Sequence, residues 1–525
     1  MVSSGTPAGA DESFRLDANP GPYAVGLRVV EQYDYSRGYR SAFGELGKPY
    51  MGERARPLQT VIWYPATKEG GATLTVRDYL HLWATETSFG DPRIAPEAKN
   101  WIAALTPALD THVWAVRDAK SASGRFPVVI YAPGASDMAW ENADLCEYLA
   151  SFGYVVIATP SFGVASRSMT TDVAGANAQA SDISFLLGFA RTLPNADTSA
   201  VGVAGDSWGG MAGLFAAARD NRIAALVALD GSTRYYPGVP KLAGDVHPEH
   251  MTIPFMYFMQ GDYSIEDRER FGNHELRDGP SVLSEWADGD LIVVHMLGMA
   301  HASFCSMWQR REDYWRAYGA SPWQPGDYGR EDAITGYAWV AKYTLKFLDA
   351  YLKHDSDALR FIKASPAQNG LPRHVMAVNF RAGTHVTRSY EDFRAEIGRR
   401  GFSHASQIYS AFQMEDPKFT LDEAAIADWA DELIGDEHWA EGIALLNLNT
   451  KIHLRSSVAS MQLGDAYRIS GMKQRAVCSY QQALSRDPSN GFAKLKLDDL
   501  SAARDEGSRK VSPLQTTDID CGVRQ

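Results

Sequence analysis

The stretch VGVAGDSWGGMAGLFAAARD, at residues 201–220, decides the fold. Its first part is a short apolar run rich in valine, and its last part, MAGLFAAARD, is typical of a helix. Between them stands Gly205-Asp206-Ser207-Trp208-Gly209, a G-x-S-x-G pattern that places a serine in a sharp turn from strand to helix. Glycine is needed two residues either side of the serine, because a side chain there would clash with the neighbouring strand and helix. We therefore expect a strained turn that presents Ser207.

Further apolar, β-rich runs alternate with helical stretches on both sides of this turn. A parallel strand covered by helices on both faces is buried on both sides, so its sequence is typically a continuous run of residues such as Val and Ile. The rhythm predicts an α/β fold with a mostly parallel sheet and helices on both faces. The runs lie at 127–134, 154–160, 201–207, 224–231, 254–262 and 290–297.

Two alternating segments, 23–33 and 58–64, precede these runs and indicate an antiparallel start to the sheet. An amphipathic helix at about 334–353 is expected to close the domain. The chain is long enough for more than one domain, since domains usually hold roughly 100–200 residues. The expected parts are a flexible arm at 1–20, an α/β-hydrolase domain at 21–365, a connecting segment at 366–419, a small all-α helical region at 420–505 and a tail at 506–525.

Composition excludes several classes of protein. The 525 residues are 45% hydrophobic, and 51 Lys and Arg against 64 Asp and Glu give a formal net charge of −13. This balance disfavours nucleic acid or an anionic membrane as a partner. The four cysteines are too few for a disulfide framework and lack the short paired spacing of a zinc site, so no structural metal is expected.

The start of the chain has neither a basic nor an apolar signal region, and no apolar run approaches the roughly 18 residues of a membrane span. A soluble protein without a membrane span is expected. A start rich in small and polar residues would also suit a chain whose export signal had been replaced by Met1, which leaves a periplasmic or secreted location open.

The helical region at 420–505 contains a spaced pattern typical of a tetratricopeptide repeat. A looser copy stands about one 34-residue period earlier, at Trp429, Leu433, Gly442 and Leu446. Three repeats are usually needed for independent stability, so we expect the pair to pack on the hydrolase domain or on another subunit, as a homo-oligomer or with a protein partner. A plain helical hairpin remains the alternative. The better copy is Leu463, Gly464, Tyr467, Ala476, Tyr480, Ala483 and Pro488, with Ser460 in place of the usual Trp.

A serine hydroxyl needs a base, and in this type of fold the order along the chain is Ser, then an acid, then His. His301 stands just beyond the run at 290–297, where the last strand would deliver a base to the turn. His295 lies within that run and is expected to be a packed core residue. Two aspartates end the strands between serine and histidine, Asp230 and Asp262, and periodicity cannot choose between them.

Six short motifs in the segment from about 20 to 350 resemble the platelet-activating-factor acetylhydrolase branch of the α/β-hydrolases, near the dienelactone-hydrolase-like proteins. In that family the acid follows the strand after the one that carries the serine, so the resemblance favours Asp230 and keeps Asp262 as the alternative acid. The motifs are GPYAVG followed by TVIWYPA, APGAS, GDSWGG, ALDG and HASF.

An oxyanion hole requires two N–H donors. The turn supplies one from Trp208, the residue after the serine, and the other is expected from Ala135. The family usually has His-Gly where this chain has Pro133-Gly134, so the glycine turn is kept and the histidine side chain is lost.

These residues predict a serine-dependent carboxylic-ester hydrolase that needs no cofactor and acts on a small-molecule ester. Aromatic side chains near the site, Trp140, Phe304 and Trp308, indicate an apolar or aromatic substrate, although such residues also serve as core. Two alternatives remain. One is a peptidase or amidase on the same fold, and the other is a non-catalytic binding protein that uses its repeats.

Overall fold

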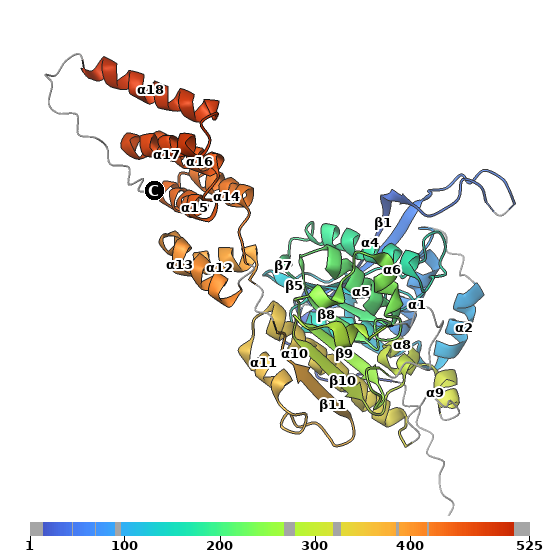
Figure 1. Cartoon of the computed structure of the whole chain (residues 1–525). Coiled ribbons are helices and arrows are strands. Elements are labelled where there is room, and N and C mark those ends of the chain that lie inside the picture. The colour runs from blue at the N-terminus through green and yellow to red at the C-terminus, as the bar shows by residue number, and fades with distance from the viewer. Residues whose placement is uncertain are drawn as a thin grey trace, which may run out of the picture. The chain divides into compact units, whose positions relative to one another are not determined.

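The computed structural model describes residues 14–44, 46–68, 70–89, 96–266, 279–318, 327–384, 388–416 and 419–508, without the side chains of 96–98, 318 and 501–508. The chain divides into two compact units, Met1–His385 and Val386–Gln525 (Figure 1).

The first unit is built on one sheet, whose strands are β1 (Ala24–Gly38), β2 (Ala55–Ala66), β3 (Thr73–Thr75), β4 (His112–Arg117), β5 (Phe126–Ala132), β6 (Val155–Ala158), β7 (Ala196–Asp206), β8 (Ile223–Leu229), β9 (Phe255–Gln260), β10 (Leu291–Met296) and β11 (Met376–Arg381). Their order across the sheet is β11-β10-β9-β8-β7-β5-β6-β2-β1-β4-β3.

The middle of this sheet is parallel. The pairs from β6 through β5, β7, β8 and β9 to β10 are all parallel. In contrast, β2 is antiparallel to both β1 and β6, and β11 is antiparallel to β10. This mixed, mostly parallel sheet has the architecture of the α/β-hydrolase fold, so the predicted fold class is confirmed.

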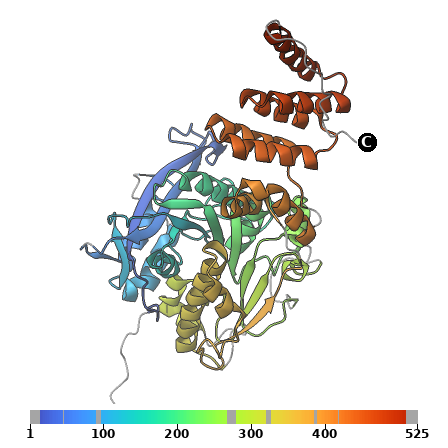
Figure 2. The same ribbon diagram turned by 90° about the vertical axis from the view of Figure 1, so that its left-hand side faces the viewer.

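Helices cover both faces of the sheet (Figure 2). Alternate residues of β5 show the two cores that result, because side chains along a strand point to opposite faces. Val129 and Tyr131 belong to the core that includes α3 (Ala143–Ser151) and α10 (Arg330–Leu352). Val128 and Ile130 belong to the core that includes α4 (Val173–Ala190) and α5 (Trp208–Arg219).

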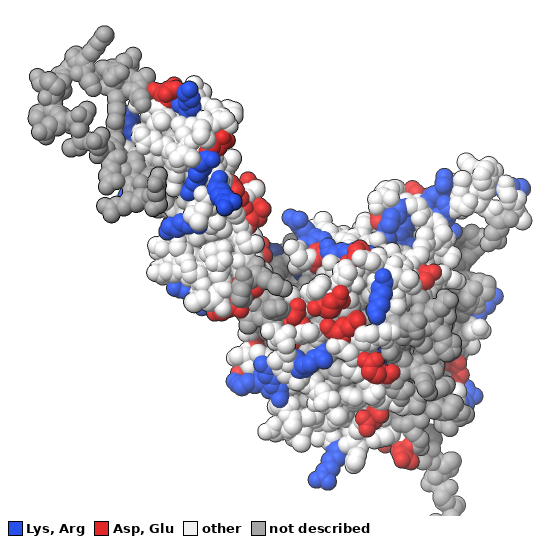
Figure 3. Space-filling view, in the orientation of Figure 1, with Lys and Arg blue, Asp and Glu red and all other residues white. Residues whose placement is uncertain are grey.

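Further helices lie in the connections of this unit. They are α1 (Val76–Leu82), α2 (Pro96–Leu105), α6 (Gly238–Ala243), α7 (Val282–Glu285), α8 (Ser306–Gln309), α9 (Glu312–Tyr318) and α11 (Ser356–Lys363). In the described part of the chain, we find no helix with the length and apolar character that a membrane crossing requires. On the face in Figure 3, acidic and basic side chains of the described residues are interspersed.

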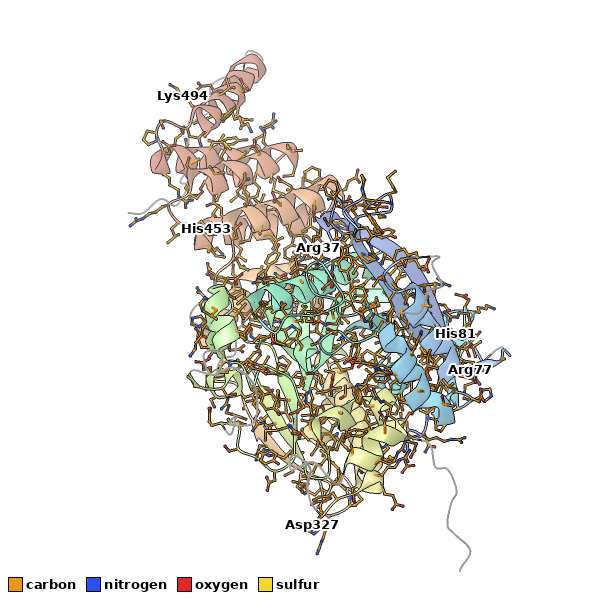
Figure 4. All side chains as sticks on the ribbon, turned by 90° about the vertical axis from the view of Figure 1, so that its right-hand side faces the viewer. Arg37, Arg77, His81, Asp327, His453 and Lys494 are labelled. Carbon is orange, nitrogen blue, oxygen red and sulfur yellow. The ribbon has the colours of Figure 1, made fainter. Side chains whose placement is uncertain are left out.

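A buried ion-pair cluster joins the β1–β2 hairpin to α4. Arg37, labelled in Figure 4, lies 2.6 Å from Oδ1 of Asp182 through its Nη2 atom. Arg56 binds both oxygens of the same carboxylate, each at 2.6 Å, and its side chain is buried. The long hairpin is therefore anchored by charge-assisted hydrogen bonds and not by apolar packing alone.

The second unit is all helical in its described residues. It consists of α12 (Tyr390–Arg400), α13 (Ala405–Glu415), α14 (Glu423–Gly435), α15 (Trp439–Ile452), α16 (Ser457–Ile469), α17 (Lys473–Arg486) and α18 (Gly491–Ser508). These helices share a core of their own, which includes Trp429, Leu446, Leu463 and Tyr480.

The segments expected at the ends and between the domains contain more structure than their sequence indicates. Residues 1–13 of the expected arm and 509–525 of the expected tail lie outside the described residues, but Phe14 is fully buried against Tyr337. The expected connection at 366–419 holds β11, α12 and α13, and the two units divide after His385. In β11, Met376 is buried and the side chains after it alternate between exposed and partly buried, as expected for an edge strand.

Candidate active site

Ser207 lies in a strained turn between β7 and α5. Its φ of 49° and ψ of −114° are unusual for a residue with a side chain. The flanking glycines make the turn possible. A Cβ on Gly209 would lie 1.9 Å from the carbonyl oxygen of Ala132, and one on Gly205 would lie 2.3 Å from the carbonyl carbon of Gly209. Neither position accepts another residue without moving the backbone.

His301 begins a short 3-10 turn (His301–Phe304) just after β10. Its Nε2 lies 3.0 Å from Oγ of Ser207, and its Nδ1 lies 2.6 Å from Oδ2 of Asp230. The backbone N–H of His301 donates to Oε1 of Gln260 at 3.0 Å, which anchors the turn to the end of β9. The structure thus joins three residues from three different connections into one hydrogen-bonded chain.

Asp230 follows β8 directly and is fully buried. Its Oδ1 accepts hydrogen bonds from the Tyr235 hydroxyl at 2.8 Å and from the backbone N–H of Gln260 at 3.2 Å, which leaves Oδ2 for His301. The Gln260 amide also donates to the Tyr235 hydroxyl at 3.1 Å. Tyr235 and Gln260 were not foreseen, because residues of their types occur throughout the sequence without marking a partner.

Asp262, the alternative acid, has a different position. Its side chain is 82% exposed, and Oδ1 lies 3.7 Å from Nδ1 of His295. The structure therefore brings Asp230 to His301 and leaves Asp262 beside the histidine that was expected to be a core residue.

The turn after β5 lies against the first turn of α5. A Cβ on Gly209 would meet the carbonyl oxygens of both Ala132 and Pro133, at 1.9 and 2.8 Å. This close approach places the segment that contains Ala135 beside the segment that contains Trp208, the two residues expected to supply N–H donors. Ala135 is half-buried and Trp208 is buried.

Two of the three aromatic residues expected near the substrate lie in the core. Trp140 and Phe304 are both fully buried. Trp308 is half-buried, with its ring centroid 5.0 Å from that of Trp101. The Arg311 guanidinium carbon lies 4.2 Å from the centre of the Trp308 ring and 4.3 Å from that of Trp101.

Two further carboxyl groups, those of Asp206 and Asp137, lie near the histidine. Burial lowers the pKa of His301, but its hydrogen bond to Asp230 and the charges of Asp230, Asp206 and Asp137 outweigh this and raise it to about 9. Burial also raises the pKa of Asp206 to about 7. The site is thus electrostatically negative around the imidazole, and protonation of Asp206 removes one of the charges that hold the proton on His301.

A comparison with known protein families finds a match in the region that contains the turn at Ser207. Residues 115–237 match the family model of Chlorophyllase, a segment that includes Ala135, Ser207 and Asp230 but not His301. No curated protein matches the sequence. Among solved structures, a ferulic acid esterase from Streptomyces cinnamoneus is 20% identical, with a TM-score of 0.47, over 70% of this chain and 98% of that chain.

Proposed function

We propose that the protein is a serine carboxylic-ester hydrolase that works through an acyl-enzyme. The observation that carries this proposal is the hydrogen-bonded chain from Oγ of Ser207 through His301 to Asp230, at 3.0 and 2.6 Å. The match of residues 115–237 to Chlorophyllase supports the same class of reaction.

In the proposed reaction, Oγ of Ser207 attacks the ester carbonyl carbon while Nε2 of His301 takes the hydroxyl proton. Asp230 accepts the hydrogen bond from Nδ1 and stabilises the imidazolium. The imidazolium then gives its proton to the departing alkoxide, and the acyl group stays on Ser207. Water attacks this acyl-enzyme with His301 again as base, which releases the acid and restores the serine.

The tetrahedral intermediate carries a negative charge on the former carbonyl oxygen. We assign its stabilisation to the backbone N–H groups of Ala135 and Trp208, because preorganised donors act strongly where water is excluded. The packing of the turn after β5 on the first turn of α5 supports this pairing.

The proposed substrate is an apolar or aromatic ester. The half-buried pair Trp101 and Trp308 supports this choice, since partly exposed aromatic side chains offer apolar contact area to a ring or an acyl chain. Membership of the acetylhydrolase-like branch stays part of the proposal and rests on the motifs around Ser207, Asp230 and His301.

The test is Ser207→Ala, assayed on nitrophenyl acetate and by labelling with a fluorophosphonate. We expect the variant to fold, to lose labelling and to lose at least about 10³-fold in kcat, because the nucleophile is removed at the cost of one hydroxyl. Retention of more than about a tenth of the wild-type rate contradicts the assignment of Ser207.

The same assays decide between the proposed esterase and its alternatives. Faster turnover of peptide anilides than of nitrophenyl esters favours a peptidase or amidase. A wild-type chain that is not labelled at Ser207 favours a non-catalytic binding protein.

For α14–α18 we propose tetratricopeptide-like repeats that position or assemble the enzyme. Gly464 supports this reading, because a Cβ there would lie 2.6 Å from the Tyr480 ring, which requires glycine where α16 meets α17. Leu463, Ala476 and Ala483, other positions of the pattern, are buried. The proposed partner is a second copy of the chain or another protein.

A further inference from the structure

Three carboxyl groups surround the turn that carries Ala135. A Cβ built on Gly134 would lie 3.0 Å from Oδ2 of Asp137, 3.2 Å from Oδ2 of Asp206 and 3.6 Å from Oε2 of Glu141. The turn is therefore held within a shell of acidic side chains directly behind the proposed oxyanion hole. Such a cluster is unexpected there, because negative charge would oppose the charge that develops on the substrate oxygen.

Glu141 contacts the turn directly. Its Oε1 accepts a hydrogen bond from the backbone N–H of Gly134 at 2.9 Å and another from the Tyr131 hydroxyl at 2.8 Å. Tyr131 lies in β5, which leads into the turn, so one carboxyl oxygen connects the strand with the turn. Glu141 is fully buried, and such hydrogen bonds are costly to lose where water cannot replace them.

The backbone around Glu141 also joins the turn to the segment of the histidine. Its carbonyl oxygen accepts from the N–H of Met307 at 3.0 Å, and the Asn142 amide donates to the carbonyl of Phe304 at 2.9 Å. Phe304 ends the 3-10 turn that begins at His301. Glu141 thus stands between the two halves of the site.

Oε2 of Glu141 is buried without a hydrogen-bond donor among the described residues, and the neighbouring carboxyl of Asp137 interacts with it electrostatically. Two carboxyl groups form a hydrogen bond only when one of them carries a proton. Burial, together with the charges of Asp137 and Asp206, raises the pKa of Glu141 well above its usual range. In its protonated form Glu141 donates to Asp137 through one oxygen and accepts from Gly134 through the other, without adding a charge behind the oxyanion.

We propose that Glu141 is a positioning residue for the oxyanion hole. Its carboxyl holds the N–H of Gly134 and thereby sets the direction of the next N–H, that of Ala135. The inference rests on the proposed ester hydrolysis, since it concerns the intermediate of that reaction.

The chain offers a closely matched control in α3, the helix that begins just after Glu141. Glu147 is 2% exposed and, like Glu141, accepts one tyrosine hydroxyl and one backbone N–H, from Tyr79 and Trp114, both at 2.6 Å. These partners are not part of the turn after β5. Loss of this carboxyl should cost similar stability and leave the oxyanion hole in place.

The experiment compares Glu141→Leu, Glu141→Gln and Glu147→Leu in the full chain. The measurements are kcat and KM on nitrophenyl acetate and the inhibition constant of an alkyl trifluoromethyl ketone, a mimic of the tetrahedral intermediate. For Glu141→Leu we expect kcat to fall by about 10²-fold, KM to change by less than about 3-fold and the ketone to bind about 10²-fold more weakly, as for a misplaced oxyanion donor.

Glu141→Gln should stay within about 3-fold of wild type in all three values, because its amide oxygen accepts from Gly134 while its NH₂ group donates to Asp137. Glu147→Leu should leave ketone binding unchanged. The inference is overturned if the two leucine variants lose kcat and ketone affinity equally, or if Glu141→Gln is as impaired as Glu141→Leu.

If Glu141→Leu does not fold, Glu141→Asp takes its place, with Glu147→Asp as its control. The shorter acid cannot keep both contacts, so its ketone affinity should fall while that of the control does not. Failure of the proposed function is distinguishable, because it would appear as turnover that survives Ser207→Ala.

Discussion

At the scale of single residues, backbone strain coincides with the proposed chemistry. Ser207 and Asp230 both have positive φ values, 49° and 43°, and such conformations cost about 1–3 kcal/mol each for residues with side chains. Hydrogen bonds from the N–H of Ser207 to Leu229 and from the N–H of Asp230 to Phe258 hold them in place. The strained backbone presents both side chains toward His301.

The first prediction at this scale compares the two aspartates. Asp230→Asn should keep Ser207 and His301 in place but lower kcat by roughly 10⁴-fold, because the imidazole is then held in the wrong tautomer. Asp262→Asn should lose at most about tenfold, as for an exposed group outside the chain of hydrogen bonds. Steady-state kinetics on nitrophenyl acetate check this ranking. The reverse order would assign the acid to Asp262, which follows β9.

A second prediction concerns pH. The neutral imidazole of His301 is the base, so kcat/KM should rise as pH rises through its pKa, which the charges of neighbouring carboxylates raise to about 9. Asp206→Asn removes one of these charges and should lower that pKa, which moves the rising limb of the pH profile to lower pH. Asp262→Asn serves as the exposed control and should leave it in place. If the rising limb of the kcat/KM profile in Asp206→Asn stays in place or moves to higher pH, the charge of Asp206 does not raise the pKa of His301.

At the scale of elements, charge and not only apolar packing joins the β1–β2 hairpin to α4. Asp182 on α4 forms ion pairs with Arg37 and Arg56, which lie on the two strands of the β1–β2 hairpin. The negative charge in turn raises the pKa of Arg56 against the effect of burial, which alone would lower it. Removing Asp182 leaves the buried guanidinium of Arg56 without its carboxylate partner.

We therefore expect Asp182→Ala to lower the free energy of unfolding by about 3–5 kcal/mol. Urea unfolding followed by circular dichroism measures the change. Asp110→Ala, which breaks an exposed pair with Arg77, is the control and should leave stability nearly unchanged. Equal effects of the two variants would show that the buried cluster is not an anchor.

At the scale of the whole molecule, the chain has two units with separate cores. The proposed triad, the turn after β5 and Glu141 all lie in the unit that ends at His385. The helical core includes Trp429 and Tyr480 and none of the proposed catalytic residues.

Removal of residues 386–525 should therefore leave turnover of nitrophenyl acetate within about twofold, because every proposed catalytic group remains. If the helices assemble the enzyme, the shortened chain should lose the oligomeric state of the full chain in sedimentation. A shortened chain that stays soluble and keeps its oligomeric state would show that the helices are instead a free binding module.

The unexpected features of the fold arise where local pattern is weak. After the buried Met376, strand β11 alternates only between exposed and partly buried positions, so its sequence resembles a loop until β10 is beside it. Trp140 and Phe304 were expected near the substrate, but a large aromatic side chain has the same appearance in sequence whether it lines a pocket or fills a core.

The sequence by itself determined the strained turn around Ser207 and the alternation of strands and helices, because both are patterns within a few consecutive residues. Only the tertiary structure placed Asp230 and not Asp262 beside His301, and Glu141 behind the oxyanion turn. The contact of Asp230 with His301 depends on strand order and on register across the sheet, whereas Glu141 reaches Gly134 through the conformation of the connection between β5 and α3. Residues far apart in sequence meet only when the sheet has formed, so no local pattern records them.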